Sequence, residues 1–307
     1  MKTLDVTQEI SPFLNKTLPY KLNDNPVLPN ALCGLAIFSS NEYRGANSKN
    51  RPTYAFPTLL TERGKSSVYQ TAGDQLNQAT ADVFCELVRL AIPITYSQTQ
   101  RIIVEFKADE FLASIDRTRG TANRNWLSEE LSRLKRASFK FELEKLCDWE
   151  TSFVSDLIED RSNGDAKSPA RYTVELNPRI IQIFHAGWKI LNSNVRSALH
   201  EKHDHLAKGL YSYYQNQSNP YDISVETLRN HMGRGELVDV NGRVIKAAQQ
   251  LSKWKKDLEP SLANLKLHTN WPVCEMDAEG KKVKVVMTNK SKKHNTAPPV
   301  NDDDCEI

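Results

Sequence analysis

The sequence predicts an α+β fold, because helical and strand-like patterns alternate along its 307 residues. A strand, two helices joined by a turn and a β-hairpin follow one another between residues 102 and 176. A similar order recurs between residues 194 and 287, although the two halves are not similar in sequence, and the longer helix of each half is basic. A helix pair backed by a β-wing is a winged helix-turn-helix, so we expect two tandem winged-helix domains behind a flexible N-terminal arm.

The first 50 residues are expected to form an arm and its anchor. Residues 1–30 contain four prolines and no sustained periodicity, which favours a flexible arm. The apolar run 31–38 would anchor the arm to the first domain, and the polar stretch 41–51 is loop-like. The expected division is arm and anchor 1–50, winged-helix domain 51–184, winged-helix domain 185–296 and an acidic disordered tail 297–307.

Local patterns give the elements of the first domain in chain order. Apolar residues at 3.6-residue spacing predict a helix over 81–91, with Thr80 as N-cap and Pro93 as its stop. A later helix, from about 124 to 137, would bury Trp126, Leu127, Leu131 and Leu134. The other expected elements are a strand over 54–60, a turn over 62–65, a strand over 102–106, a helix over 108–115, a loop over 116–123, and strands over 139–143 and 172–176 that pair across a tip at 160–169.

The second domain is expected to repeat this order with different lengths. Ser224 would cap a short helix over 225–232, and a glycine-rich turn over 233–235 would follow. The long helix over 244–258 would end before Pro260. The other expected elements are helices over 194–199 and 206–215 and strands over 265–267 and 284–287 that flank a lysine-rich hairpin at 280–282.

The longer helix of each half concentrates positive charge. The net charge is +3, but four acids lie after residue 297, so residues 1–297 hold 41 bases against 34 acids, or +7. The stretch 124–140 carries +3 and the stretch 229–257 carries +4. An apolar stripe fixes one face of each helix, so the bases project from the other, as on a helix that enters the major groove. The alternative is that each basic face is only solvated. Two such helices, each preceded by a short helix and followed by a hairpin, favour binding to duplex DNA.

The candidate DNA contacts follow from these two helices. DNA contacts are expected from Arg124, Arg133 and Arg136 in the first domain and from Arg243, Lys246 and Lys253 in the second. Arg234 in the turn and Lys281, Lys282 and Lys284 in the wing would hold phosphates. The full set is Arg117, Arg119, Arg124, Arg133, Arg136, Arg229, Arg234, Arg243, Lys246, Lys253, Lys281, Lys282 and Lys284.

Several other classes of protein are disfavoured. There is no run of about 18 apolar residues that could span a membrane, and the start lacks the apolar stretch of a secretory signal. Five scattered cysteines without a Cys-x-x-Cys pair suit a reducing cytoplasm. Gly64-Lys65-Ser66 resembles the end of a phosphate-binding loop, but no glycine occurs from 51 to 63, so a hairpin turn is favoured. We expect no cofactor, no metal and no catalytic residue.

An enzymatic alternative rests on Tyr211 and Tyr214, which lie at i and i+3 of one helix. A rolling-circle nickase would form a phosphotyrosyl bond there, with a metal held by two histidines that flank a hydrophobe. The nearest candidate, His203-Asp204-His205 with His200 close by, has an acid in the centre. The tyrosines are therefore expected to pack one domain on the other, with a hydroxyl kept wet. A transcriptional repressor of the same fold is a second alternative.

Four segments resemble the TrfA family of plasmid replication initiators, in matching order over about residues 31–270. They are GDQLNQ at 73–78 with the helix ADVFCELVRLA at 81–91, YTVELNPRII at 172–181, LAKGLYSYY at 206–214, and PY at 220–221 leading into VETL at 225–228. The acidic end at 302–307 is not part of the resemblance.

The resemblance implies a two-winged-helix initiator that binds directly repeated iterons at a plasmid origin. It implies that monomers melt and bind an AT-rich single-stranded element, that dimers restrain copy number, and that host DnaA, the DnaB helicase and the polymerase sliding clamp are recruited. The stretch nearest to the family's clamp-binding motif, 17–22, lacks its glutamine. Two helices in successive major grooves need half-sites about 10–10.5 bp apart, which predicts a site of roughly 17–22 bp. Bending there and binding of the single strand could open the duplex without nucleotide hydrolysis.

Overall fold

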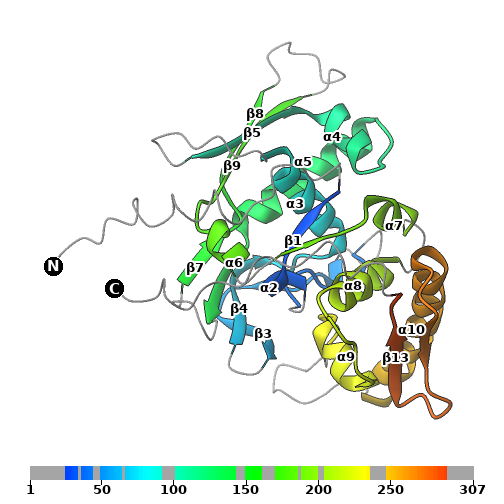
Figure 1. Cartoon of the computed structure of the whole chain (residues 1–307). Coiled ribbons are helices and arrows are strands. Elements are labelled where there is room, and N and C mark those ends of the chain that lie inside the picture. The colour runs from blue at the N-terminus through cyan, green and yellow to red at the C-terminus, as the bar shows by residue number, and fades with distance from the viewer. Residues whose placement is uncertain are drawn as a thin grey trace, which may run out of the picture.

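The computed structural model shows a protein of mixed helix and sheet (Figure 1). It describes residues 25–33, 36–43, 49–63, 66–91, 101–142, 149–160, 170–185, 188–199, 204–235 and 247–288. Most of the predicted arm and all of the predicted acidic tail lie outside these residues, and so does the clamp-motif stretch 17–22. Two parts repeat one arrangement of elements: we call residues 78–176 the first unit and residues 204–286 the second unit. The predicted domain boundaries stay predictions.

The first unit is a helix followed by a strand, two helices and two further strands, with two strands of another sheet inserted after the second helix of the pair. These elements are α3 (Gln78–Ala91), β5 (Ile102–Lys107), α4 (Ala108–Ser114), α5 (Thr121–Arg136), β8 (Val154–Asp160) and β9 (Arg171–Leu176). Strand β9 lies between β5 and β8 and is antiparallel to both. Helix α5 buries Leu127, Leu131 and Leu134 as its spacing predicts, whereas Trp126 is only partly buried.

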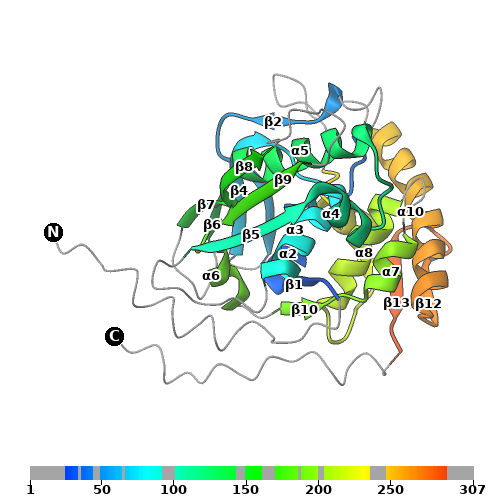
Figure 2. The ribbon, with the colours of Figure 1, turned by 90° about the horizontal axis from the view of Figure 1, so that it is seen from above.

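The second unit repeats this order of elements. They are α8 (Asp204–Gln215), β11 (Ile223–Ser224), α9 (Val225–His231), α10 (Ala247–Thr269), β12 (Val273–Met276) and β13 (Lys282–Val286). Strand β13 lies between β11 and β12, so the last strand again pairs with both others. Ser224 caps α9 as predicted, because its side chain accepts the Thr227 backbone N–H at 3.0 Å. Viewed from above (Figure 2), α3 and α8 lie side by side, between the sheets of the first unit and α10.

A further sheet, which we call the central sheet, packs against α5. It contains β2 (Thr53–Tyr54), β3 (Thr58–Arg63), β4 (Ser66–Asp74), β6 (Ser138–Glu142) and β7 (Trp149–Ser152). The strands run β2-β4-β6-β7, and β3 also pairs with β4. Strands β3 and β4 are antiparallel neighbours with Arg63 opposite Ser66. Gly64 and Lys65 of the predicted turn lie outside the described residues. The sequence did not predict β4, β7 or β8.

The segment before the first unit is partly structured. Strand β1 (Val27–Pro29) pairs with β10 (Trp188–Ile190), and the short helix α2 (Asn30–Cys33) follows it. The prediction of a flexible arm through residue 30 is therefore wrong for 27–30. A strand of three residues is too short to show periodicity, and it pairs with a partner about 160 residues away in the sequence. Ile37 and Phe38 of the predicted apolar anchor are buried, and the Phe38 ring lies 5.7 Å from that of Phe84 on α3.

The pairing predicted for the first hairpin is wrong. Strand β6 was expected to pair with the strand now seen as β9, but β6 pairs with β4 and β7, and β9 pairs with β5 and β8. Alternation of Phe139 and Phe141 correctly predicted a strand with one buried face. Periodicity of two identifies a face but not a partner, so the strand was assigned to the wrong sheet.

The end predicted for the long helix of the second unit is also wrong. Helix α10 continues through Pro260 to Thr269, so the strand predicted over 265–267 is helical. A proline inside a helix costs about 3 kcal/mol. Burial of Trp254, Leu258, Leu262 and Leu265 along one face offsets this cost. Similarly, α3 begins at Gln78, because the Asn77 side chain accepts the backbone N–H of Thr80, the residue predicted as the cap.

Candidate nucleic-acid interface

The first half of α10 turns a polar stripe to the surface. The exposed residues of this stripe, which we call the α10 stripe, are Gln249, Ser252, Lys253 and Lys256. They fall at i, i+3, i+4 and i+7, which places them on one face of the helix. Buried Trp254 and Leu258 fix the opposite face, and the Trp254 indole donates to the Val225 carbonyl of α9 at 3.0 Å. The stripe therefore offers an amide, a hydroxyl and two amines to a partner.

The hairpin between β12 and β13 lies against this helix. Gly280 adopts φ +61° at the turn, and a Cβ there would lie 3.6 Å from the Lys255 amine of α10. The Asp277 carboxylate accepts the Lys281 backbone N–H at 2.6 Å, and this bond is the main reason why the pKa of Asp277 is lowered. The exposed lysines of the hairpin are Lys281, Lys282 and Lys284. Helix and hairpin together place lysines from two elements close to one another.

These second-unit lysines are open to a partner. Among the residues that the structure describes, the amines of Lys253, Lys256, Lys281 and Lys282 make no ion pair. Lys284 faces Glu275 across the strand pair, which places an acid beside it. Amines outside ion pairs are available to hold a phosphate. The charges of Lys281 and Lys282 also help to lower the pKa of the nearby Asp277.

Helix α5 differs, because its basic residues are held by acids of the first unit. Arg133 is 16% exposed and contacts Glu130 at 2.6 Å and Glu129 at 2.9 Å. Lys135 pairs with Asp156 of β8 at 2.8 Å. Arg136 remains 57% exposed, with Glu129 at 3.4 Å. The remaining exposed residues of α5 are uncharged or acidic: Thr121, Ala122, Asn125 and Glu129.

The loop that leads into α5 holds two of the predicted arginines. The Arg117 guanidinium lies over the Trp126 ring, 3.5 Å from its centroid. Arg119 is exposed and has no ion pair within the described part of the chain. Arg124, in the first turn of α5, makes two 2.7 Å hydrogen bonds to the Asp109 carboxylate of α4. Arg119 is thus the loop arginine best placed for a phosphate.

Two predicted contacts of the second unit point into the protein. Arg229 is 6% exposed and donates to the Arg234 carbonyl at 2.7 Å. Arg234 donates to the Ser40 carbonyl at 3.0 Å and to the Asp257 carboxylate at 2.9 Å. These contacts argue for a structural role at both positions. Arg243 and Lys246 lie outside the described residues.

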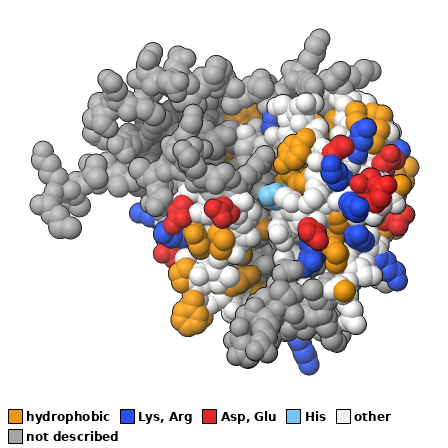
Figure 3. Space-filling model, turned by 90° about the horizontal axis from the view of Figure 1, so that it is seen from below, with side chains coloured by type: hydrophobic (Ala, Val, Ile, Leu, Met, Phe, Trp, Pro, Cys, Tyr) orange, Lys and Arg blue, Asp and Glu red, His pale blue; other side chains and the backbone are white. Residues whose placement is uncertain are grey.

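The described surface mixes charges rather than forming one positive field. Figure 3 shows basic and acidic side chains interspersed on the side where α10 and β13 lie in Figure 1. A mixed surface favours contacts by individual residues over long-range attraction. The candidate interface therefore depends on the α10 stripe and the hairpin lysines.

Comparison with solved structures finds matches that include two crystal structures of RctB domains. The chain is similar to a crystal structure of selenomethionine derivatives of domains 2 and 3 of RctB, with 12% identity, a TM-score of 0.44, and coverage of 75% of this chain and 86% of that chain. A second crystal structure of RctB domains 2–3, over its residues 155–483, matches with 11% identity, a TM-score of 0.45, and coverage of 79% and 94%. No protein-family model matches the sequence, and no curated protein matches it significantly.

The two tyrosines of the nickase alternative are buried in the second unit. Tyr211 is 2% exposed, and its hydroxyl accepts the Asn192 backbone N–H at 3.0 Å. Tyr214 is fully buried, and burial raises the pKa of both phenols. Both rings pack near Trp271, so they fill the core of the second unit rather than a wet contact between units.

Neither a candidate metal site nor a membrane-spanning helix occurs among the residues that the structure describes. Among the described residues, no group of three or more histidine, cysteine or acidic side chains could hold a metal ion. His200 and His203 lie outside those residues, while His205 is buried beside the Asn41 carbonyl. No helix in the described part of the chain is long and apolar enough to cross a membrane.

Sequence reasoning missed part of the α10 stripe. Gln249 and Ser252 carry no charge, so the basic pattern does not indicate them, and Lys256 is distinguished from the other bases only once the buried face of the helix is known. Trp254 and Leu258, four residues apart, could have fixed the buried face and so the stripe. The acids that neutralise α5 could not have been found in this way, because Asp109 and Asp156 come from other elements.

Proposed function

We propose that this protein is a sequence-specific, non-enzymatic DNA-binding replication initiator of the TrfA type, built from two winged helix-turn-helix units. It binds iteron repeats at a plasmid origin, promotes local opening of an AT-rich element, and brings in host DnaA, the DnaB helicase and the sliding clamp. It acts on DNA as a monomer, and its dimers restrain copy number.

The recurrence of one unit carries this proposal. In both units a helix is followed by a strand, two helices and a pair of strands, and the last strand lies between the other two; in the first unit β6 and β7 of the central sheet come between α5 and that pair. This order supports a winged-helix fold, in which the second helix of the pair would enter the major groove. Here those helices are α5 and α10. Two such units in one chain fit a site with two half-sites, and the sequence resemblance to initiators adds the biological role.

The surfaces of α5 and α10 support different tasks. The α10 stripe and hairpin lysines suit phosphates and base edges together, since lysine amines hold phosphates and an exposed glutamine can pair with adenine. On α5 the exposed Asn125 offers an amide of the same kind, and Arg119 and Arg136 offer charge at either end. We therefore place the larger part of the phosphate contacts in the second unit.

The test is footprinting on the origin of the parent plasmid, with permanganate probing of unpaired thymines in the same samples. Regularly repeated protection of roughly 17–22 bp beside reactive thymines is the expected result. Protection without reactive thymines, even with purified DnaA added, would favour the repressor. If no origin fragment is protected, the proposed DNA-binding role is rejected.

The nickase alternative has a direct assay. Supercoiled origin plasmid incubated with the protein and Mg²⁺ or Mn²⁺ should stay supercoiled under our proposal, because the Tyr211 and Tyr214 hydroxyls are buried away from any DNA. Nicked circles with protein attached to a 5′ end would overturn the non-enzymatic assignment. The Tyr211→Phe variant would then show whether that residue is the nucleophile.

A further inference from the structure

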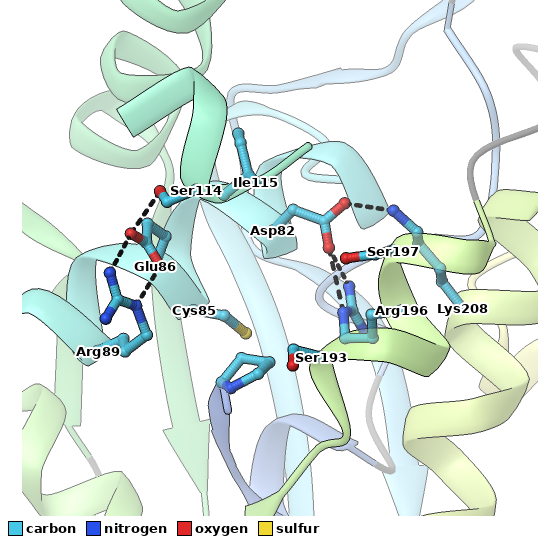
Figure 4. Close-up of a pocket in the computed structure, with 11 residues that line it drawn as sticks. Asp82, Cys85, Glu86, Arg89, Ser114, Ile115, Ser193, Arg196, Ser197 and Lys208 are labelled. Atoms are coloured by element: carbon cyan, nitrogen blue, oxygen red, sulfur yellow. Dashed lines mark hydrogen bonds and ion pairs between the residues drawn. The ribbon is translucent and has the colours of Figure 1, made fainter. Parts of the chain in front are cut away.

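A largely buried carboxylate joins the two units. Asp82 lies on α3 of the first unit, and its carboxylate accepts hydrogen bonds from Arg196 at 2.5 and 3.1 Å and from the Lys208 amine at 2.7 Å. Lys208 lies on α8 of the second unit, and Arg196 on α7 (Ser193–Ala198) just before it. Figure 4 shows the three side chains converging in a pocket between these helices.

This cluster is largely but not fully buried, with the Asp82 and Lys208 side chains 21% and 14% exposed. Arg196 is 4% exposed and also donates to the Ser212 hydroxyl of α8 at 3.0 Å. Burial alone raises the pKa of Asp82, but the charges of Lys208 and Arg196 outweigh it and hold that pKa well below its usual range. Removing one partner of a buried ion pair leaves an uncompensated charge, so the contact resists separation of the helices.

A second inter-unit contact lies beside Gly209, the neighbour of Lys208 in α8. Ser40 follows the apolar anchor, and its hydroxyl donates to the Met232 carbonyl and accepts from Arg234 Nε, both at 3.0 Å. Arg234 continues to Asp257 on α10. A Cβ on Gly209 of α8 would lie 3.5 Å from the Ser40 side chain, so the backbones approach closely here.

The segment that contains Ser39 and Ser40 also contacts the start of the first unit. The Ser39 N–H donates to the Leu76 carbonyl at 3.0 Å, and the Ser39 carbonyl accepts the Gln78 N–H of α3 at 3.2 Å. Residues 39–40 therefore contact the start of α3 on one side and the end of α9 on the other. Together with the Asp82 cluster, they connect α5 and α10 through two separate sets of buried contacts.

We propose that the Asp82–Arg196–Lys208 cluster and the Ser40–Arg234–Asp257 contact hold α5 and α10 in one fixed relative position, so that the protein specifies the spacing between two DNA half-sites. This inference rests on the proposed function. One added base pair rotates a half-site by about 35° and moves it by about 3.4 Å, a misfit that a rigid pair of helices cannot follow. Asp82, Lys208 and Ser40 are then positioning residues that need not touch DNA.

The experiment begins with selection of duplex sites from random DNA by the full chain, followed by a spacing series with one or two base pairs inserted between the half-sites. Unmodified protein is expected to lose about tenfold or more in affinity for each added base pair. The double variant Lys208→Gln, Ser40→Ala is expected to lose less than about threefold in affinity for each added base pair. Its affinity for an isolated half-site should stay unchanged. Lys107→Gln, which removes an exposed ion pair within the first unit, is the matched control and should keep the steep profile.

A second readout needs no DNA. Spin labels at Ala122→Cys on α5 and Ala263→Cys on α10, both exposed, report the distance between these helices once Cys147 and Cys305 are replaced by serine. A single narrow distribution that broadens in the double variant is expected. An unchanged distribution together with an unchanged spacing profile would overturn the inference. Failure to select any site, with broadening still seen, would instead reject the proposed function while leaving the inter-unit contacts established.

Discussion

The two units share an order of elements but place their charges differently. In the first unit the bases of α5 are bound by acids from α4, α5 itself and β8, so charge contributes to holding the helices together. In the second unit the lysines of α10 and the hairpin make no such pairs within the described residues. The same fold thus uses basic residues for internal cohesion in one copy and leaves them at the surface in the other. A count of bases along each helix does not show this difference.

The largest effect is expected from the buried acid of α5. Glu130 is 2% exposed, contacts Arg133 at 2.6 Å and accepts the Thr80 hydroxyl at 2.5 Å. Glu130→Ala leaves Arg133 without its closest partner and should lower the free energy of unfolding by about 3–5 kcal/mol. Urea denaturation measures this. Glu129→Ala, which removes a half-exposed partner of the same arginine, should cost under about 1 kcal/mol. Equal losses would mean that burial does not distinguish the two acids.

Acid should weaken the junction between the units. The folded-state pKa of Asp82 is lowered, so its contribution to stability is present above its unfolded pKa of about 3.9 and is lost progressively as the pH falls below that value. Urea midpoints measured from pH 7 down to pH 2 should therefore decline below about pH 4. In the Lys208→Gln variant this pKa moves back toward its usual range, so the share of the decline that belongs to Asp82 should shrink. A variant whose decline matches that of the unmodified protein would contradict the assignment.

The open lysines should affect DNA and not folding. Lys281→Ala with Lys282→Ala removes two amines that make no ion pair in the described chain, so the melting temperature should stay unchanged. Affinity for any duplex should fall, and the salt dependence should become shallower by about 1 for each lysine that holds a phosphate. Titrations at several salt concentrations measure the slope. Lys107→Ala, an ion-paired lysine of the first unit, should leave that slope unchanged.

The smallest difference concerns the equivalent short helices α4 and α9. Ser224 caps α9 through its side chain, whereas Lys107 at the start of α4 makes no side-chain cap. Ser224→Ala should therefore cost about 1 kcal/mol in unfolding free energy. Thermal denaturation of this variant beside Lys107→Ala provides the comparison. A larger loss in Lys107→Ala would reverse the ranking.

Local chemistry made much of the fold predictable. The 3.6-residue spacing placed α3, α4, α5, α8 and α9, and Ser224 was correctly identified as a cap. The predictions were wrong where contacts between distant residues determine strand pairing. Strand β6 pairs with β4, and β1 pairs with β10, across long stretches of sequence. Pro260 predicts the end of a helix, but α10 continues through it. Burial of the apolar residues on both sides of Pro260 offsets the free-energy cost of a proline inside a helix.

The candidate site was predictable only at the level of elements. The basic character of α10 and the lysine-rich hairpin could be seen in the sequence, and both lie at the surface. Which bases are open could not be seen, because Arg229 and Arg234 bind backbone carbonyls in the folded chain. The inter-unit cluster joins residues more than 100 positions apart, so no local pattern indicates it.

The buried cysteines give each unit its own chemical reporter. Cys85 lies on α3 and Cys274 on β12, and burial raises the pKa of both thiols to about 12. Only the thiolate reacts quickly with alkylating reagents, so both side chains stay inert while their unit is folded. With the remaining cysteines replaced, the rate at which each of these two thiols is alkylated reports the opening of its own unit. Mass spectrometry of the alkylated peptides then shows whether the two units open together or one at a time.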